Sequence, residues 1–220
     1  MNLQFSKKES IFLYLNNNKD KMLEATFLLS IQYGFDNVSI KQIQKEANVS
    51  AGAIYYHFKD KNDILNHMLN KYLKGSVEDF KKNLRKYDGS FTEKLKFIFY
   101  LHLGKELNNE KHVIKLSNDI EIDHTEFDLF LLGIYHQHHE LRPLFDEMTI
   151  EMLDIFTEFI EEFKEKKEIR NDLDSEDIAL HIYSVVGGFI KLWVGFTHIP
   201  LEKYIDINIK MICESVCISN

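Results

Sequence analysis

The chain has 220 residues, a formal net charge of −8 and a hydrophobic fraction of 45%. A chain of this length and composition can bury a sizeable core, which excludes wholesale disorder. It contains only nine Gly and two Pro, about 5% against a usual ~12%, which disfavours turn-rich sandwiches and barrels and favours long helices.

The charge is distributed unevenly along the chain. Residues 1–75 carry ten Lys against seven Asp or Glu, whereas the remaining residues carry 17 basic and 28 acidic side chains. The net negative charge of the chain argues against non-specific binding to nucleic acid. The basic first third still permits a local surface that contacts phosphate groups. Two regions with different partners are therefore expected.

Two further features bear on the compartment. The only cysteines, Cys213 and Cys217, are four residues apart, a spacing on a helix at which a disulfide would be strained. With no secretory signal at the start, a cytoplasmic location is expected. The apolar stretch 178–199 is interrupted by Lys191 and by Gly187 and Gly188, which favours a buried helix or a subunit interface over a membrane span.

The first elements are predicted from periodicity and capping. Residues 1–18 show no clear period and are expected to form an arm. A helical period begins at Lys19 and ends at Gly34, where a left-handed C-terminal cap fits. Ser39 stands three residues before Gln42 in a capping-box pattern, so a second, short helix is expected there.

A third short helix and a long fourth one follow. Asn48 tolerates positive φ and predicts a tight turn, and Ser50 is placed to cap a helix over 51–58. Asp60 begins a helix that continues to a break at 88–90. No flexible linker separates the basic and acidic parts, so this helix is expected to be a rigid connection.

Six further helices are predicted, over 91–107, 112–121, 125–139, 144–168, 175–197 and 201–217. The clearest carries a bulky seam suited to another helix: Phe145, Met148, Met152, Ile155, Phe159 and Phe163. No long strand alternation occurs. The predicted fold is all-α, with three short helices in 19–66 joined by a long helix to a larger helical domain, 67–220.

The helix, tight turn and helix of residues 39–58 fit the geometry that places a helix in the major groove of DNA. The small side chains of 50–53 allow a helix N-terminus to approach base edges and to point its amides at phosphate. Ile54 and Phe58, four residues apart, are expected to anchor the opposite face in a small core.

The stretch VSIKQIQKEANVSAGAIYYHFKDKNDIL, 38–65, resembles the DNA-binding segment of the tetracycline-repressor (TetR) family of one-component regulators. The match extends back to Gly34 and Phe35 in the turn after the first predicted helix, and the resemblance covers about 19–70. It is strongest at Val49, Ser50, Gly52, Ile54, Tyr55, Tyr56, His57, Phe58, Lys59 and Lys61. Taken singly, Phe58 is more typical of a core aromatic, and Tyr55 is as typical of a core as of a DNA contact. His57, Lys59 and Lys61 are each typical of a solvated surface.

The resemblance implies a role for each matching position. Ser39 would hold a phosphate, Ser50, Ala51, Gly52 and Ala53 would meet bases, Tyr55, Tyr56 and His57 would bind phosphates or line the groove, and Lys61 would reach phosphate. Ala51 and Ala53 offer only methyl groups. Hydrogen-bonded base readout therefore falls to Lys41, Gln42 or Gln44, or specificity relies on thymine methyls and DNA shape.

The acidic remainder shows a much weaker resemblance, which implies an effector-binding and dimerisation domain. A seam of Phe156, Phe159 and Phe163 with a second helix carrying Gly187, Phe189 and Leu192 is expected to build a two-fold, four-helix interface. A homodimer would place two recognition helices about one DNA turn, ~34 Å, apart. The expected partner is then double-stranded DNA with a palindromic operator.

An effector pocket is expected in the interior between 91 and 160. Its candidate residues are Phe97, Tyr100, Phe127, Phe130, Tyr135 and Met152. Each is individually typical of plain core, but together they favour a small apolar or aromatic molecule. Binding of that molecule would release the operator, so the predicted function is a ligand-released repressor.

Two patterns support rival interpretations. His136, His138, His139 and Glu140 form a dense run that a metal-dependent helical hydrolase could use, but no HExxH pattern occurs and a surface cluster is favoured. Cys213 and Cys217 could bind a soft metal or sense oxidation. No P-loop, nucleophile elbow or dinucleotide fingerprint is present. We therefore expect neither an enzyme nor a bound cofactor or metal.

Overall fold

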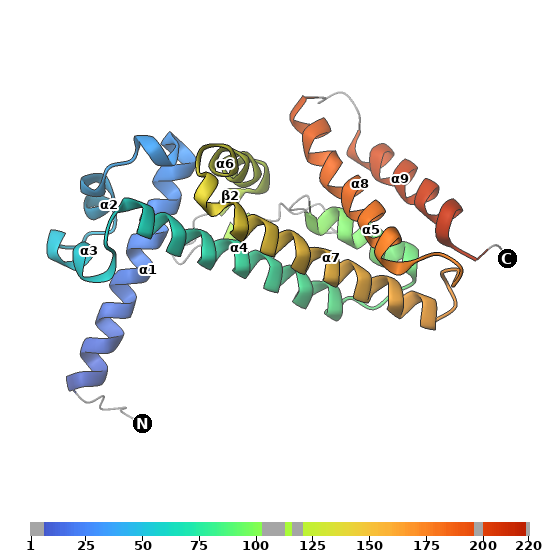
Figure 1. Ribbon diagram of the computed structural model, residues 1–220, viewed down its shortest axis with the longest axis horizontal. Helices are drawn as coiled ribbons and strands as arrows, with labels where there is room; N and C mark the ends of the chain where they lie inside the picture. Colours follow the sequence, from blue (N-terminus) through green and yellow to red (C-terminus); the bar gives the residue numbers. More distant parts are fainter. Residues whose placement is uncertain (1–6, 103–112, 116–120, 196–199, 219–220) are drawn as a thin grey trace.

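The computed structural model describes residues 7–102, 113–115, 121–195 and 200–218. Within these residues the chain is almost wholly helical, as predicted (Figure 1). The helices are α1 (Lys7–Tyr33), α2 (Ile40–Glu46), α3 (Ala51–His57), α4 (Lys61–Lys86), α5 (Phe91–His102), α6 (His124–Gln137), α7 (Arg142–Glu165), α8 (Ser175–Gly195) and α9 (Leu201–Val216). Two 3-10 turns, η1 (Phe35–Asn37) and η2 (His139–Leu141), complete the helical elements.

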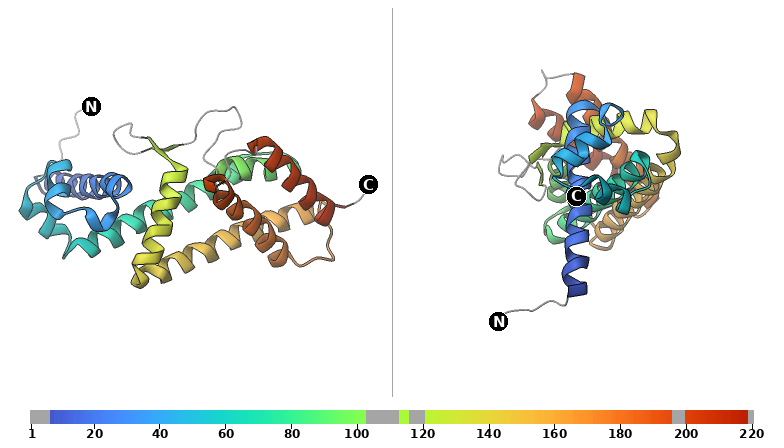
Figure 2. Two further views of the ribbon diagram at one scale, coloured as in Figure 1. Left: turned by 90° about the horizontal axis from the view of Figure 1, so that it is seen from above. Right: turned by 90° about the vertical axis from the view of Figure 1, so that its left-hand side faces the viewer.

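The long helix α4 starts among the N-terminal helices and runs towards the other end of the molecule, so its two ends lie in different surroundings (Figure 1). Helices α1, α2 and α3 gather around the N-terminal end of α4, while α5, α8 and α9 lie towards the other end and α7 packs along α4 (Figures 1 and 2). The helix continues without a break through 66 and 67. The rigid connection expected from the sequence is therefore present.

The local signals at the start of the chain are confirmed. Gly34 has φ 77° and its N–H donates to the Ser30 carbonyl at 2.9 Å, which ends α1. Asn48 has φ 51° in the turn between α2 and α3. Asp60 caps α4 by accepting a hydrogen bond from the Asp63 N–H at 2.8 Å. Each of these is decided by residues within four positions, which is why periodicity and capping find them.

Two expectations about elements are corrected. Helix α1 begins at Lys7, inside the segment expected to be an arm, because Lys, Glu and Leu favour helix even where no apolar stripe marks it. The helix predicted over 112–121 is wrong: β1 (Val113–Lys115) and β2 (Glu121–Asp123) pair antiparallel, with Val113 opposite Asp123. Both strands contain β-branched residues, which favour a pleated strand over a helix.

Aromatic packing joins the N-terminal helices to the larger region. Phe27 of α1 is fully buried; its ring stacks on Tyr72 of α4, with centroids 4.2 Å apart. The same ring meets Phe127 and Phe130 of α6 edge-on, at 5.6 and 6.0 Å. Helix α6 therefore packs on α1, which in turn packs on the N-terminal half of α4. Among the described residues, no helix is long and apolar enough to cross a bilayer.

Candidate DNA-binding surface

The unit formed by α2, a short turn and α3 is built by its capping residues. Ser39 Oγ accepts from the Gln42 N–H at 3.2 Å, and Gln42 Oε1 accepts from the Ser39 N–H at 2.8 Å, so the predicted capping box is confirmed. Ser50 Oγ accepts from the Ala53 N–H at 3.3 Å and caps α3. The two helices are thus fixed at their N-termini by side chains of their own sequence.

The inner face of α3 is held in the small core. Ile54 and Phe58 are 1% and 2% exposed, which confirms them as the anchors of the helix. The Lys19 ammonium lies 5.7 Å from the centre of the Phe58 ring, and the His67 ring meets that ring edge-on at 5.5 Å. These contacts fix α3 against α1 and α4.

The outer face of α3 is open to solvent. Tyr55 and Tyr56 are 62% and 69% exposed, and Ala51 and Gly52 are exposed beside them. A Cβ atom added at Gly52 would meet no other atom within 4 Å. The absence of a side chain at Gly52 is therefore not required by the packing of this chain. It leaves room for a surface from outside to approach the start of α3.

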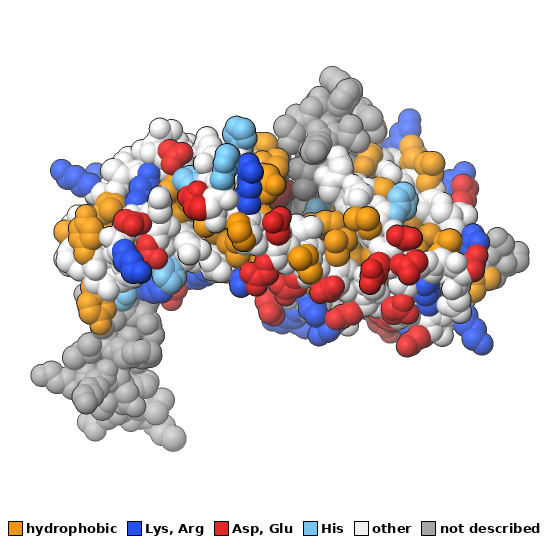
Figure 3. All heavy atoms as spheres, viewed as in Figure 1, with side chains coloured by type: hydrophobic (Ala, Val, Ile, Leu, Met, Phe, Trp, Pro, Cys, Tyr) orange, Lys and Arg blue, Asp and Glu red, His pale blue; other side chains and the backbone are white. Residues whose placement is uncertain are grey.

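Basic side chains surround this face. Lys41, Lys45 and Lys59 are all exposed. Nearby carboxylates are engaged in holding the backbone: Asp63 accepts a hydrogen bond from the Lys59 N–H at 2.9 Å, and Asp60 caps α4. In Figure 3 hydrophobic (orange) and basic (blue) side chains lie together at the left end of the molecule, with some acidic ones (red) beside them. A mixture of aromatic and basic groups is what a phosphate backbone and its grooves require.

Three of the residues predicted to contact DNA also interact with other residues of the chain. Burial, and then the charge of Lys19, lowers the pKa of His57, which disfavours the charged imidazole that a phosphate would select. Lys61 Nζ donates to the Asp36 carbonyl at 3.1 Å. The Gln42 side-chain oxygen also accepts from the Ser39 hydroxyl at 2.7 Å. Contacts of these residues with DNA remain predictions.

The six residues predicted to line an effector pocket are divided among several helix pairs. Phe97 stacks on Tyr87 at 4.4 Å, and the Tyr100 hydroxyl donates to the Glu202 carboxylate at 2.5 Å. Burial, and then the hydrogen bond to Glu202, raises the pKa of the Tyr100 phenol to about 12. These two residues therefore face α4 and α9 respectively.

The remaining predicted pocket residues lie elsewhere. Phe127 and Phe130 contact Phe27, the Tyr135 ring meets Phe145 edge-on at 5.4 Å, and Met152 is buried in α7. In the described residues these six side chains therefore contact different neighbours, and their role in binding an effector stays a prediction. Each aromatic side chain packs against whichever helices lie beside its own helix. The sequence alone does not show which of these side chains lie in the same part of the core.

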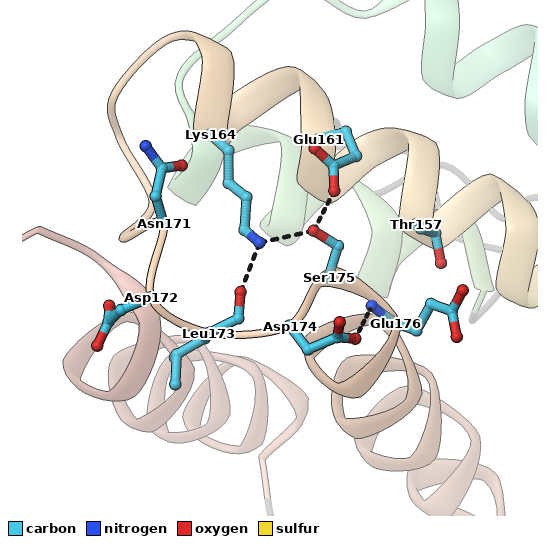
Figure 4. A pocket seen from close by; sticks show the side chains of 9 residues that line it. All are labelled: Thr157, Glu161, Lys164, Asn171, Asp172, Leu173, Asp174, Ser175 and Glu176. Atoms are coloured by element: carbon cyan, nitrogen blue, oxygen red, sulfur yellow. Dashed lines mark hydrogen bonds between the residues drawn. The ribbon is translucent and has the colours of Figure 1, made fainter.

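A described hollow lies at the connection of α7 and α8, and it is polar (Figure 4). Lys164 Nζ donates to the Leu173 carbonyl and to Ser175 Oγ, both at 2.6 Å, and the Ser175 hydroxyl donates to Glu161. Figure 4 shows these groups bonded to one another across the connection. They hold the two helices together, and this hollow does not have the apolar lining that was predicted for an effector.

The predicted dimer seam is also corrected. Phe156, Phe159 and Phe163 are at most 3% exposed in the single chain. Phe156 stacks on Phe80 of α4, and Phe159 and Phe163 contact Phe91 of α5 at 5.4 and 5.6 Å. A bulky seam fits a helix of the same chain as well as one of a partner, and here α4 and α5 cover it.

The second helix predicted to form the dimer interface is α8, and only part of it can be compared with the prediction. Gly187 lies in α8 with open space around its Cα, whereas the side chains of Phe189 and Leu192 lie outside the described residues. Sequence reasoning missed three exposed apolar side chains on the last two helices. They are Leu180 of α8 and Ile207 and Met211 of α9, which are 52%, 47% and 62% exposed.

The structure does not support the alternative metal and redox sites at the histidine run and the cysteine pair. His136 and His139 are exposed, whereas His138 is buried and directed towards Asp36, so the histidines do not converge. Among the described residues, no three His, Cys, Asp or Glu side chains are grouped to hold a metal ion. Burial and the neighbouring Cys213 raise the pKa of the Cys217 thiol to about 12, which disfavours a reactive thiolate.

This fold and this surface define a helix-turn-helix DNA-binding protein with a helical companion region. Residues 22–68 match the sequence model described as "Bacterial regulatory proteins, tetR family". The chain is 27% identical over 112 residues to the probable HTH-type transcriptional regulator YttP of Bacillus subtilis, a match that spans 50% of this chain and 53% of that protein.

Solved structures share the fold over nearly the whole chain. A TetR-family transcriptional regulator from Cytophaga hutchinsonii superposes with a TM-score of 0.73 at 16% identity, covering 99% of this chain and 100% of that one. FadR from Bacillus subtilis, solved with stearoyl-CoA, superposes with a TM-score of 0.65 at 19% identity, covering 88% and 96%. Residues 22–68 therefore resemble the DNA-binding segment of TetR-family transcriptional regulators, and the fold of the chain is the one that these solved structures share.

Proposed function

We propose that the protein is a repressor that binds a palindromic operator as a homodimer and releases it when a small molecule binds the helical region after residue 67. The observation that carries this proposal is the outer face of α3. Two exposed tyrosines and an unobstructed glycine stand there among exposed lysines, on a helix whose opposite face is buried.

The start of α3 is the part that enters the major groove. Its side chains at 51–53 are small, so the helix N-terminus comes close to the base edges and its amides face the DNA backbone. The methyl groups of Ala51 and Ala53 suit thymine methyls. Tyr55 and Tyr56, on the exposed flank, reach the phosphates or groove walls on either side.

The homodimer forms through α8 and α9. Their exposed apolar side chains Leu180, Ile207 and Met211 would be buried by a second copy of the same surface. These helices lie at the opposite end of the molecule from α3 (Figure 1). A two-fold axis there sets two copies of α3 side by side, about 34 Å apart on one face of a duplex.

The effector is a small apolar or aromatic molecule. The region after 67 is rich in aromatic side chains, and the FadR neighbour was solved with a ligand that carries a long acyl chain. Releasing DNA requires the effector to bind the DNA-incompetent arrangement more tightly. A hundredfold loss of operator affinity corresponds to about 2.7 kcal/mol of coupling, an ordinary value for allostery.

Selection of bound duplexes from a random pool, followed by sequencing, tests the proposal. We expect enrichment of a two-fold symmetric motif. If each subunit neutralises about four phosphates, the affinity for that motif should fall with salt at a log-log slope near −7. The absence of any enriched motif, a motif without symmetry, or binding that does not depend on salt would contradict the proposed function.

A further inference from the structure

A buried histidine joins the end of α6 to the turn between α1 and α2. His138 follows α6 directly and is 8% exposed. Its ring meets the buried Phe35 ring edge-on, with centroids 5.5 Å apart, and its Nε2 lies 3.4 Å from Asp36 Oδ1. Phe35 and Asp36 form η1, so this contact spans from the effector-binding region to the helix-turn-helix region.

The other ring nitrogen of His138 faces a second carboxylate. Nδ1 lies 3.3 Å from Glu140 Oε1 in a hydrogen bond, whereas the buried Nε2 makes no hydrogen bond despite its distance to Asp36. A neutral imidazole has a single N–H, so it serves one carboxylate and turns a lone pair to the other. Only the protonated ring donates to both Glu140 and Asp36.

The other charged groups around this contact hold its two sides in place. On the η1 side, Lys61 Nζ donates to the Asp36 carbonyl and lies 4.4 Å from the centre of the Phe35 ring. On the η2 side, Arg142 Nε donates to the Tyr135 carbonyl at 3.5 Å, and His139 is exposed. The pKa of Glu140 is held below its usual range by its own backbone N–H and by His138.

We propose that His138 is a positioning residue for DNA binding: in its protonated form it clamps η2 to η1 and so fixes the α2–α3 unit relative to the effector-binding region. This inference rests on the proposed function as an operator-binding regulator. Histidine changes charge between about pH 5 and pH 8.

A double-mutant cycle that needs no DNA tests the clamp itself. His138→Gln, Asp36→Asn and the double variant are unfolded by denaturant at pH 5.5 and pH 8, and the coupling between the two changes is taken from the unfolding constants. We expect a coupling of about fivefold at pH 5.5 and less than twofold at pH 8. No coupling at pH 5.5, or the same coupling at both values, would overturn the clamp.

Operator binding then tests the role in positioning. With the duplex selected above, we expect the affinity of the wild-type protein to fall about threefold more between pH 6 and pH 8 than that of His138→Gln. His139→Gln removes an exposed imidazole one residue away and should keep the wild-type profile. Identical profiles for wild type and His138→Gln would overturn the role of His138 in DNA binding.

The two proposals fail in different ways. Coupling at pH 5.5 with no duplex selected would contradict the proposed function, and with it the role of the clamp in DNA binding. A selected duplex without pH-dependent coupling would overturn the clamp alone and leave operator binding standing.

Discussion

Lys61 and Phe35 form a cation–π contact in which the ammonium lies 4.4 Å from the ring centre. Lys61 is the first residue of α4 and Phe35 the first of η1, so the contact closes the helix-turn-helix region on itself. Burial lowers the pKa of Lys61, although the charge of Asp36 opposes that shift. The family resemblance assigns this lysine to phosphate, and the structure gives it a second role in the fold.

Replacement of Lys61 by Ala should therefore affect stability as well as DNA binding. Loss of the cation–π contact and of the hydrogen bond to the Asp36 carbonyl should reduce the free energy of unfolding by about 1 kcal/mol. Binding to all duplexes should weaken to a similar degree. Denaturant unfolding and binding titrations measure both effects. Lys59→Ala, at an exposed lysine, should weaken binding with no loss of stability, and equal losses in the two variants would contradict the structural role.

Replacement of Gly52 by Leu should abolish specific binding without harming the fold. Because the space around Gly52 is open, the variant should be as stable as the wild type or more stable by up to about 1 kcal/mol. The added side chain would hold α3 away from the bases and should lower operator affinity more than a hundredfold. Gly75→Leu is the matched control, since Gly75 is also helical, exposed and unobstructed. Normal operator binding by the Gly52 variant would show that α3 is not the recognition helix.

Replacement of Leu180 by Lys should dissociate the proposed homodimer. Burying a charge in the two-fold surface should weaken self-association at least a hundredfold, about 2.7 kcal/mol, as measured by sedimentation equilibrium. Leu132 of α6 is equally exposed, at 52%, and its change to Lys should leave the dimer intact. Phe156→Ala should instead lower the free energy of unfolding by about 3–5 kcal/mol, because Phe156 lies in the core of each chain. If Leu132→Lys were the variant that dissociates, the interface would lie on α6.

A largely buried ion pair between α5 and α7 should make stability depend on pH. Lys94, whose side chain is 6% exposed, donates to both oxygens of Glu162 at 3.0 and 3.1 Å. Burial opposes ionisation of Glu162, but hydrogen bonds from Lys166 and Lys94 prevail and hold its pKa below the usual range. The contribution is therefore present above about pH 4.3, the ordinary value for Glu, and is lost as the pH falls through the lowered value.

Glu162→Gln should reduce the free energy of unfolding at pH 7 by about 2 kcal/mol, less than for a fully buried pair because the Glu162 side chain is 38% exposed. The difference from the wild type should shrink at pH 3.5, where denaturant unfolding is repeated. Glu165→Gln, at an exposed position of the same helix, should show neither effect. A difference that is constant with pH would mean that the charge of Glu162 is not what stabilises Lys94.

The helix-turn-helix region was predictable because its signals are local. The Ser39–Gln42 capping box, the positive φ of Asn48 and the cap at Ser50 are each decided by residues a few positions apart. The side chain of a capping residue bonds to a backbone N–H only a few residues further along the chain, so the pair can be recognised in the sequence. For the same reason the resemblance to the TetR family could be read from one continuous stretch.

Which apolar surface meets which was decided only by the tertiary structure. Phe156 and Leu180 are both apolar residues on helices, yet α4 covers the first and leaves the second exposed. The periodicity of a helix shows that one face is apolar, but a helix of the same chain and one of a partner bury it equally well. The contact of His138 with Asp36 likewise exists only because α6 packs on α1, which no local pattern encodes. Local hydrogen bonds therefore determine the α2–α3 unit, which the sequence alone predicts. The packing of distant helices determines the core, the exposed faces and the connection between the two regions.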